Sequence, residues 1–123
     1  MTTNVKVISG RDFVRARPDG HANVETAEKL IADIAQAGAG LDEFAILVDT
    51  RDVSDQLTAF ELWKLSAKLV RFRHTFERRT AVLCPAEKFD LTQFFPLCAA
   101  NHGLNISAFT SYEGAMEWLI GEG

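Results

Sequence analysis

Three aspartates, Asp49, Asp52 and Asp55, recur at three-residue intervals in the stretch LVDTRDVSDQL. Carboxylate oxygens are the ligands that hard cations prefer, so a cation site is the first chemistry to test. The stretch lacks the central glycine and the distal glutamate of a calcium-binding loop. Solvation and turn formation therefore explain these aspartates better than a metal site does.

A cysteine nucleophile is the second possible chemistry. Cys84 ends a strand-like run, and His102 is a conceivable base for it. A buried cysteine that packs as a small apolar side chain is far commoner, and we expect this for Cys84 and Cys98, as free thiols rather than a disulfide. His21 and His74 stand apart from His102, and no CxxC or HxxxH pattern occurs. We predict no metal site.

Nucleotide-binding glycine motifs are also missing after the predicted strands. The small residues of AGAGLDEF, 37–44, follow a helix and precede a strand, so they form a connector. We therefore expect no cofactor and no catalytic residue, and we interpret the protein as non-enzymatic. An enzyme that uses Cys84 or the aspartates of 49–55 stays open as a third hypothesis.

Composition places the chain among ordinary globular proteins. It has 123 residues, 47% hydrophobic and 24% charged, which predicts a single domain over residues 1–123. A net charge of −4 argues against nucleic-acid binding. No apolar run is long enough for a transmembrane segment, and MTTNVKV does not resemble a signal peptide. We expect a cytoplasmic protein.

The elements that position these residues alternate along the chain. Two strand-like runs, 5–9 and 12–17, flank the turn signal Ser9-Gly10-Arg11 and predict a hairpin. Further strands are predicted over 44–50, 80–84 and 104–109, and helices over 24–38, 58–76, 91–103 and 112–120. The order ββαβαβαβα predicts an α/β fold with a mixed, mostly parallel five-stranded sheet, an N-terminal antiparallel hairpin and about four helices.

Local signals set the ends of these helices. Asn23 is the expected N-cap of the helix over 24–38, and Asp90 is a possible cap of the helix over 91–103. Pro96 inside that helix indicates a kink or a late start. The closing helix is expected to bury Trp118 and Leu119.

The helix over 58–76 begins with a capping box and is apolar on two sides. Thr58 and Glu61 have the spacing at which each side chain binds the other residue's amide. One stripe should pack on the sheet: Leu62, Leu65, Leu69, Phe72 and Phe76. The opposite stripe contains Phe60, Trp63, Ala67 and Val70. It is covered by a neighbouring element, forms a protein interface (most simply a homodimer), or lines a small-molecule pocket.

Basic residues gather on and after the same helix. They are Lys64, Lys68, Arg71, Arg73, His74, Arg78 and Arg79. Two explanations stay open: a solvated face with ion pairs to acids elsewhere, or a surface for an anionic partner such as lipid head groups or an acidic protein. Together with the second stripe, Lys64 and Arg71 complete the possible interface.

The order of elements and several runs resemble the STAS domains, most closely the bacterial SpoIIAA-like group, often described with the SEC14-like lipid-binding fold. The resemblance is carried by the initial hairpin and by the runs LVDT, TAVLC, ISAF and EGAMEWL. It spans nearly the whole chain. It implies a SpoIIAA-like fold and a regulatory or protein-binding role.

Anti-sigma-factor antagonists of that family carry Asp-Ser-Ser-Gly at the start of the corresponding helix, where one serine is phosphorylated. Laid on this chain, the motif falls on Leu57, Thr58, Ala59 and Phe60. Only Thr58 keeps a hydroxyl, so it is a vestigial phospho-switch position at most.

Our leading hypothesis is a non-enzymatic interaction module that homodimerises or binds a partner through the helix over 58–76. The alternative is binding of lipid or another apolar ligand. Nine phenylalanines, among them Phe94, Phe95 and Phe60, could line a pocket, although core packing explains them equally well.

Overall fold

Five strands form one sheet in the order β1-β2-β3-β4-β5 in the computed structural model, which describes residues 2–8 and 13–121. β1 pairs with β2 antiparallel, and the remaining neighbours are parallel. The strands are β1 (Val5–Ile8), β2 (Phe13–Ala16), β3 (Ala45–Asp49), β4 (Thr80–Leu83) and β5 (Ile106–Phe109). The predicted α/β class, the ββαβαβαβα order of elements, the mixed five-stranded sheet and the N-terminal hairpin are confirmed; the turn at 9–11 lies outside the described residues.

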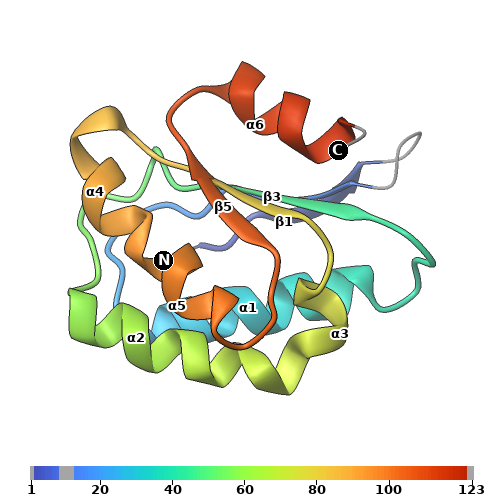
Figure 1. The fold of residues 1–123 in the computed structure, drawn as a ribbon, viewed down its shortest axis with the longest axis horizontal. Helices are drawn as coiled ribbons and strands as arrows, with labels where there is room; N and C mark the ends of the chain where they lie inside the picture. Colours follow the sequence, from blue (N-terminus) through green and yellow to red (C-terminus); the bar gives the residue numbers. More distant parts are fainter. Residues whose placement is uncertain (1, 9–12, 122–123) are drawn as a thin grey trace.

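The helices cover the two faces of the sheet unequally. They are α1 (Val24–Gly38), α2 (Ala59–Lys68), α3 (Arg73–Phe76), α4 (Phe89–Thr92), α5 (Phe94–Ala100) and α6 (Tyr112–Ile120), with 3₁₀ turns η1 (Leu69–Phe72) and η2 (Ala86–Lys88). Each connection between parallel strands leads to the next strand on the same side of the previous one. Because such connections are right-handed, the helices within them lie on the same face of the sheet. Figure 1 shows α1, α2 and α5 on that face and α6 on the other.

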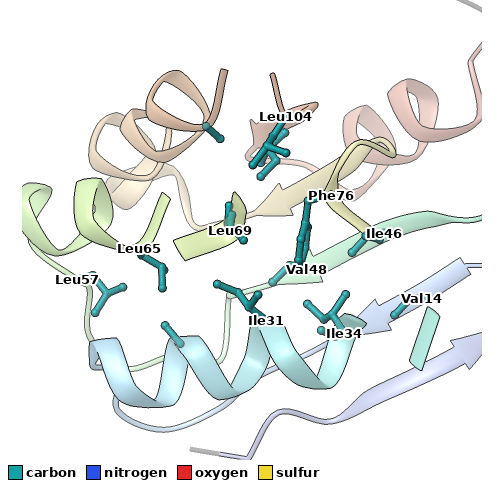
Figure 2. Packing of buried hydrophobic residues seen from close by; sticks show 14 residues of the cluster. Val14, Ile31, Ile34, Ile46, Val48, Leu57, Leu65, Leu69, Phe76 and Leu104 are labelled. Atoms are coloured by element: carbon teal, nitrogen blue, oxygen red, sulfur yellow. The ribbon is translucent and has the colours of Figure 1, made fainter. Parts of the chain in front are cut away.

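The main core lies between the sheet and the α1–α2–α5 layer. Alternate residues of the strands, among them Val14, Ile46 and Val48, point into it. Ile31 and Ile34 from α1 and Leu65 from α2 meet them, as Figure 2 shows. A smaller cluster under α6 takes the other strand face and includes Phe13, Leu47, Ala81, Leu83, Ala115 and Leu119.

The predicted helix over 58–76 is not continuous. Its α-helical part ends at Lys68, η1 follows, and one short turn of α-helix brings Phe76 into the core, where it is 3% exposed. Branched and aromatic residues in this segment, such as Val70, Phe72 and Thr75, have weak helix propensity, so packing of Phe76 determines its path.

The predicted helix over 91–103 is also divided, and it begins earlier, at η2. Asp90 is not a cap, because it lies in the first turn of α4. Pro96 has no N–H to donate to Thr92, so the helical hydrogen bonding is interrupted between α4 and α5. Pro96 instead occupies the first turn of α5, where amides have no partner inside the helix.

The other helix ends follow their local signals. Asn23 accepts a hydrogen bond from the amide of Thr26 and caps α1, as predicted. Ser111 caps α6. Leu119 is buried as expected, whereas Trp118 is only half-buried and lies beside the ring of Phe109, 5.5 Å between centroids.

Candidate functional site

The start of α2 is fixed by the predicted capping box. The amide of Glu61 donates to Thr58 Oγ1 at 3.2 Å, and the amide of Thr58 donates to Glu61 Oε1 at 2.9 Å. Leu57, just before the cap, is buried in the main core. These contacts set the rotation of α2, so that Leu65, and Leu69 at the start of η1, pack into the main core while the opposite side faces solvent.

The outer face of α2 presents two aromatic rings to solvent. Phe60 and Trp63 are 65% and 58% exposed, and their rings stack with centroids 6.1 Å apart. Ala67 beside them is exposed, while Val70 is half-buried. Leu97, on the neighbouring helix α5, is exposed to the same degree as Phe60. The domain itself therefore leaves most of the second apolar stripe uncovered.

The basic residues of this region divide into two groups. Lys64 lies over the Phe60 ring, 5.4 Å from its centroid, and Arg71 and Arg73 are exposed. The rest have partners within the domain. Lys68 pairs with Glu28, Arg78 stacks on Phe44, His74 lies near Glu77, and Arg79 donates to the carbonyls of Trp118 and Gly121. The positive charge on the α2 face is therefore smaller than the sequence indicated.

The carboxyl end of β3 carries a buried ion pair. Asp49 is 5% exposed, and the Arg51 guanidinium binds both of its oxygens, at 3.0 and 2.8 Å. Burial alone would raise the pKa of Asp49, but hydrogen bonds from the Arg51 side chain and amide, with the charges of Arg51 and Arg17, lower it overall. Asp49 is thus an ionised anchor of the strand end.

Asp52 shares Arg17 with Asp49, and Asp55 binds the 21–22 segment. Asp52 accepts a hydrogen bond from Arg17 Nε at 2.7 Å. Asp55 accepts from the amide of Ala22 at 2.5 Å and lies 3.4 Å from His21 Nδ1; the amide lowers its pKa. No group of three His, Cys, Asp or Glu suited to a metal ion occurs within residues 2–8 and 13–121. The aspartates serve to hold loops to one another.

Both cysteines are free and buried, as expected. Cys84 is 1% exposed, and burial raises the pKa of its thiol. His102 is half-buried at the end of the α5 segment, where its amide bonds to Ala99. A protonated, buried thiol is a poor nucleophile.

A cavity of about 150 Å³ lies beneath the loop that joins β3 to α2. Its walls come from α1, α2, β4 and the segment after β4, and none of the nine phenylalanines lines it. Its apolar lining is Pro18, Ala22, Ala27, Leu30, Val53, Leu57, Leu62 and Val82; its polar lining is Thr50, Asp55, Gln56, Lys88 and Thr92. This pocket is aliphatic rather than the aromatic one that the sequence suggested.

Lys88 and Arg17 were missed by sequence reasoning. The ammonium of Lys88 binds the carbonyls of Val53 and Asp55, so η2 holds the β3–α2 loop over the cavity. The available signal was positional, because Lys88 and Arg17 each follow shortly after the carboxyl end of a parallel strand, where binding groups gather in α/β sheets.

Comparison of the chain with protein-family models, with curated proteins and with solved structures finds no match. The class of protein that can be stated is therefore the α/β fold with a five-stranded mixed sheet. Over the described residues, no helix has the length and apolar character needed to cross a membrane.

Proposed function

We propose that the protein is a non-enzymatic, STAS-like interaction module that associates through the outer face of α2, most simply with a second copy of itself. One observation carries the proposal: Phe60 and Trp63 stack in solvent, more than half exposed, on a helix whose other side is well packed. Aromatic side chains are enriched at the centres of protein interfaces.

The energetic argument concerns the apolar area of these rings. Covering the exposed parts of Phe60 and Trp63 removes on the order of 200 Å² of apolar surface from water, which contributes about 5 kcal/mol before the entropic cost of association. Leu97 adds exposed apolar area on the adjoining helix. The helix thus offers a compact anchor to which the rest of an interface can be added.

The order of elements supports the STAS-like part of the proposal. A non-enzymatic role is supported by the state of the two side chains most suited to catalysis, since neither is free to react. Asp49 is neutralised by Arg51, and Cys84 is buried with a raised pKa. Thr58 at the family's switch position is engaged in the cap of α2.

The test is the oligomeric state of Trp63→Asp, measured by size-exclusion chromatography with light scattering. We expect the wild-type chain of 13.6 kDa to elute at twice that mass and the variant to elute as a monomer with an unchanged melting temperature. Tyr112→Asp is the matched control, because Tyr112 is an exposed aromatic residue on α6, across the sheet. A monomeric wild type would contradict the proposal, and so would a variant whose melting temperature falls while its oligomeric state stays unchanged.

Salt distinguishes a second copy from an acidic partner. A two-fold interface apposes the same patch of both copies, so two faces that each carry Lys64 and Arg71 repel one another and added salt strengthens the dimer. An acidic partner would bind the same face more weakly as salt rises.

A further inference from the structure

The cavity beneath the β3–α2 loop combines an apolar wall with one cationic side chain. Of the described residues that line it, Lys88 is the only one with a positive charge. Most of the remaining lining is aliphatic, from Leu30, Leu57, Leu62 and Val82 among others. A mostly apolar lining with a few polar groups, here one of them cationic, is the usual composition of a small-molecule site.

Size sets the class of occupant. The cavity volume is about 150 Å³. An apolar protein cavity of about that volume holds benzene. A single six-membered ring or a short alkyl chain therefore fits, whereas the two acyl chains of a phospholipid do not.

The ammonium of Lys88 is only partly satisfied by the protein. It donates to the carbonyl of Val53 at 3.1 Å and, more weakly, to that of Asp55 at 3.5 Å. It makes no ion pair with a residue of the described part of the chain. An ammonium has three donors, so at least one remains for a ligand.

The one acidic residue of the lining compensates this cation only in part: the charge of Lys88 is the last of the causes that lower the pKa of Asp55. The Asp55 carboxylate accepts from the amide of Ala22 and lies beside His21, where it is about half-exposed. Its charge is thus turned toward the 21–22 segment and solvent. An anionic ligand beside Lys88 Nζ would compensate the ammonium more fully than Asp55 does, whereas a neutral ligand would not.

We infer that this cavity binds a small apolar carboxylate of the size of benzoate. The ring lies among Leu30, Leu57 and Leu62, and the carboxylate accepts a hydrogen bond from Lys88 Nζ. Binding also fixes the β3–α2 loop, because the same ammonium holds the carbonyls of Val53 and Asp55. The site is separate from the outer face of α2 and does not depend on the interaction proposed for that face.

The test is an amide NMR titration of the labelled protein with benzoate and with benzamide, its neutral counterpart of the same shape. We expect benzoate to bind with a dissociation constant on the order of 1 mM, as its nine heavy atoms allow. Shifts should centre on Leu57, Val82 and Lys88. Benzamide should bind about ten-fold more weakly, because it lacks the charge that strengthens the bond to Lys88.

Four variants assign the effect to the cavity. Lys88→Met should weaken benzoate about ten-fold and leave benzamide unchanged, whereas Lys88→Arg should retain benzoate binding. Lys6→Met, which removes an exposed cation on β1, should change neither ligand. Ala22→Leu fills the cavity and should abolish binding of both, with folding checked by the dispersion of the amide spectrum.

Three outcomes would overturn the inference. These are no saturable shifts with benzoate, shifts centred on the surface arginines instead of the cavity, or equal affinities for benzoate and benzamide in the wild type. Trp63→Asp should leave benzoate binding intact, so failure of this site and failure of the α2 interface are told apart.

Discussion

Asp49→Asn tests whether the buried ion pair at the end of β3 stabilises the fold. In the wild type, Arg51 donates its amide and Nε to Oδ1, at 3.1 and 3.0 Å, and a terminal nitrogen to Oδ2 at 2.8 Å. Asparagine keeps the Oδ1 acceptor but replaces Oδ2 with an NH₂ group, which faces the Arg51 donor. The variant therefore loses one charge-assisted hydrogen bond and the carboxylate charge.

The expected cost follows from the burial of the site. A hydrogen bond to a charged group contributes about 1.5–3 kcal/mol. The aspartate is 5% exposed, so its charge is poorly solvated, but Arg51 is half-exposed and regains water in the variant. We expect Asp49→Asn to lower the free energy of unfolding by about 2 kcal/mol at pH 7. Asp52→Asn is the matched control: its pair with Arg17 is half-exposed on both sides, and we expect a loss of at most about 0.5 kcal/mol.

The contribution of this ion pair to stability depends on pH. The pKa of Asp49 is lowered by folding. The ion pair therefore stabilises the protein fully above the unfolded pKa, about 3.9, and this stabilisation is lost as pH falls through the lower folded pKa. The gap between wild type and Asp49→Asn should be constant from about pH 5 to 8 and narrow below about pH 4.

Urea denaturation at a series of pH values measures this gap. A gap under about 0.5 kcal/mol at pH 7 would refute the reasoning. A full-size gap that persists unchanged to about pH 3 would also refute it, because the aspartate of the unfolded wild type is protonated there and this protonation favours unfolding.

Three further predictions concern packing, capping and the thiol. Thr58→Ala should cost about 1 kcal/mol in urea denaturation, because the amide of Glu61 loses its acceptor; an unchanged midpoint would contradict this. Gly38→Ala should destabilise by about 1–3 kcal/mol, since its Cβ would lie 2.5 Å from the Phe44 ring; a gain in melting temperature would show that the ring moves aside freely. Cys84 should react with iodoacetamide at least about ten-fold more slowly in the folded than in the urea-unfolded protein, followed by peptide mass spectrometry. Because folding raises the pKa of this thiol above its ordinary 9.0, stability should fall as pH rises past 9.0; equal reactivity in both states would contradict the assignment.

The fold could be predicted because its signals are local. The apolar runs at 44–50, 80–84 and 104–109 have the length of buried strands and are too short for buried helices. Because they alternate with helices, few sheet topologies are possible. The caps at Asn23 and Thr58 depend on residues three positions apart, so they too are readable in sequence.

Of the two breaks inside the predicted helices, the sequence indicated the one near Pro96 as a kink or a late start and missed the one at η1. Pro96 marks its break locally, since a proline removes the hydrogen bond to the residue four positions before it. The turn at η1 has no such marker. It forms where packing of Phe76 against the sheet outweighs weak helix propensity in the preceding residues.

The cavity could not be predicted because its one cation reaches it across the fold. Lys88 lies far along the chain from Val53 and Asp55, whose carbonyls it binds. Likewise, Arg78 and Arg79 looked like part of a basic face, but stack on aromatic rings of other elements. The sequence shows that a segment carries a charged side chain. Only the tertiary contacts determine whether that side chain is already paired within the fold or remains able to bind a ligand.

The two sides of α2 separate stability from recognition. Leu65 and Leu69 are almost fully buried and fasten the helix to the sheet, so substitutions there act through cavity formation and cost about 2–5 kcal/mol. Phe60 and Trp63 contribute little to that packing because most of each ring remains in water. A loss of association without a loss of stability can therefore come only from the outer side, which is why a charge at position 63 distinguishes an interface from a merely exposed pair of rings.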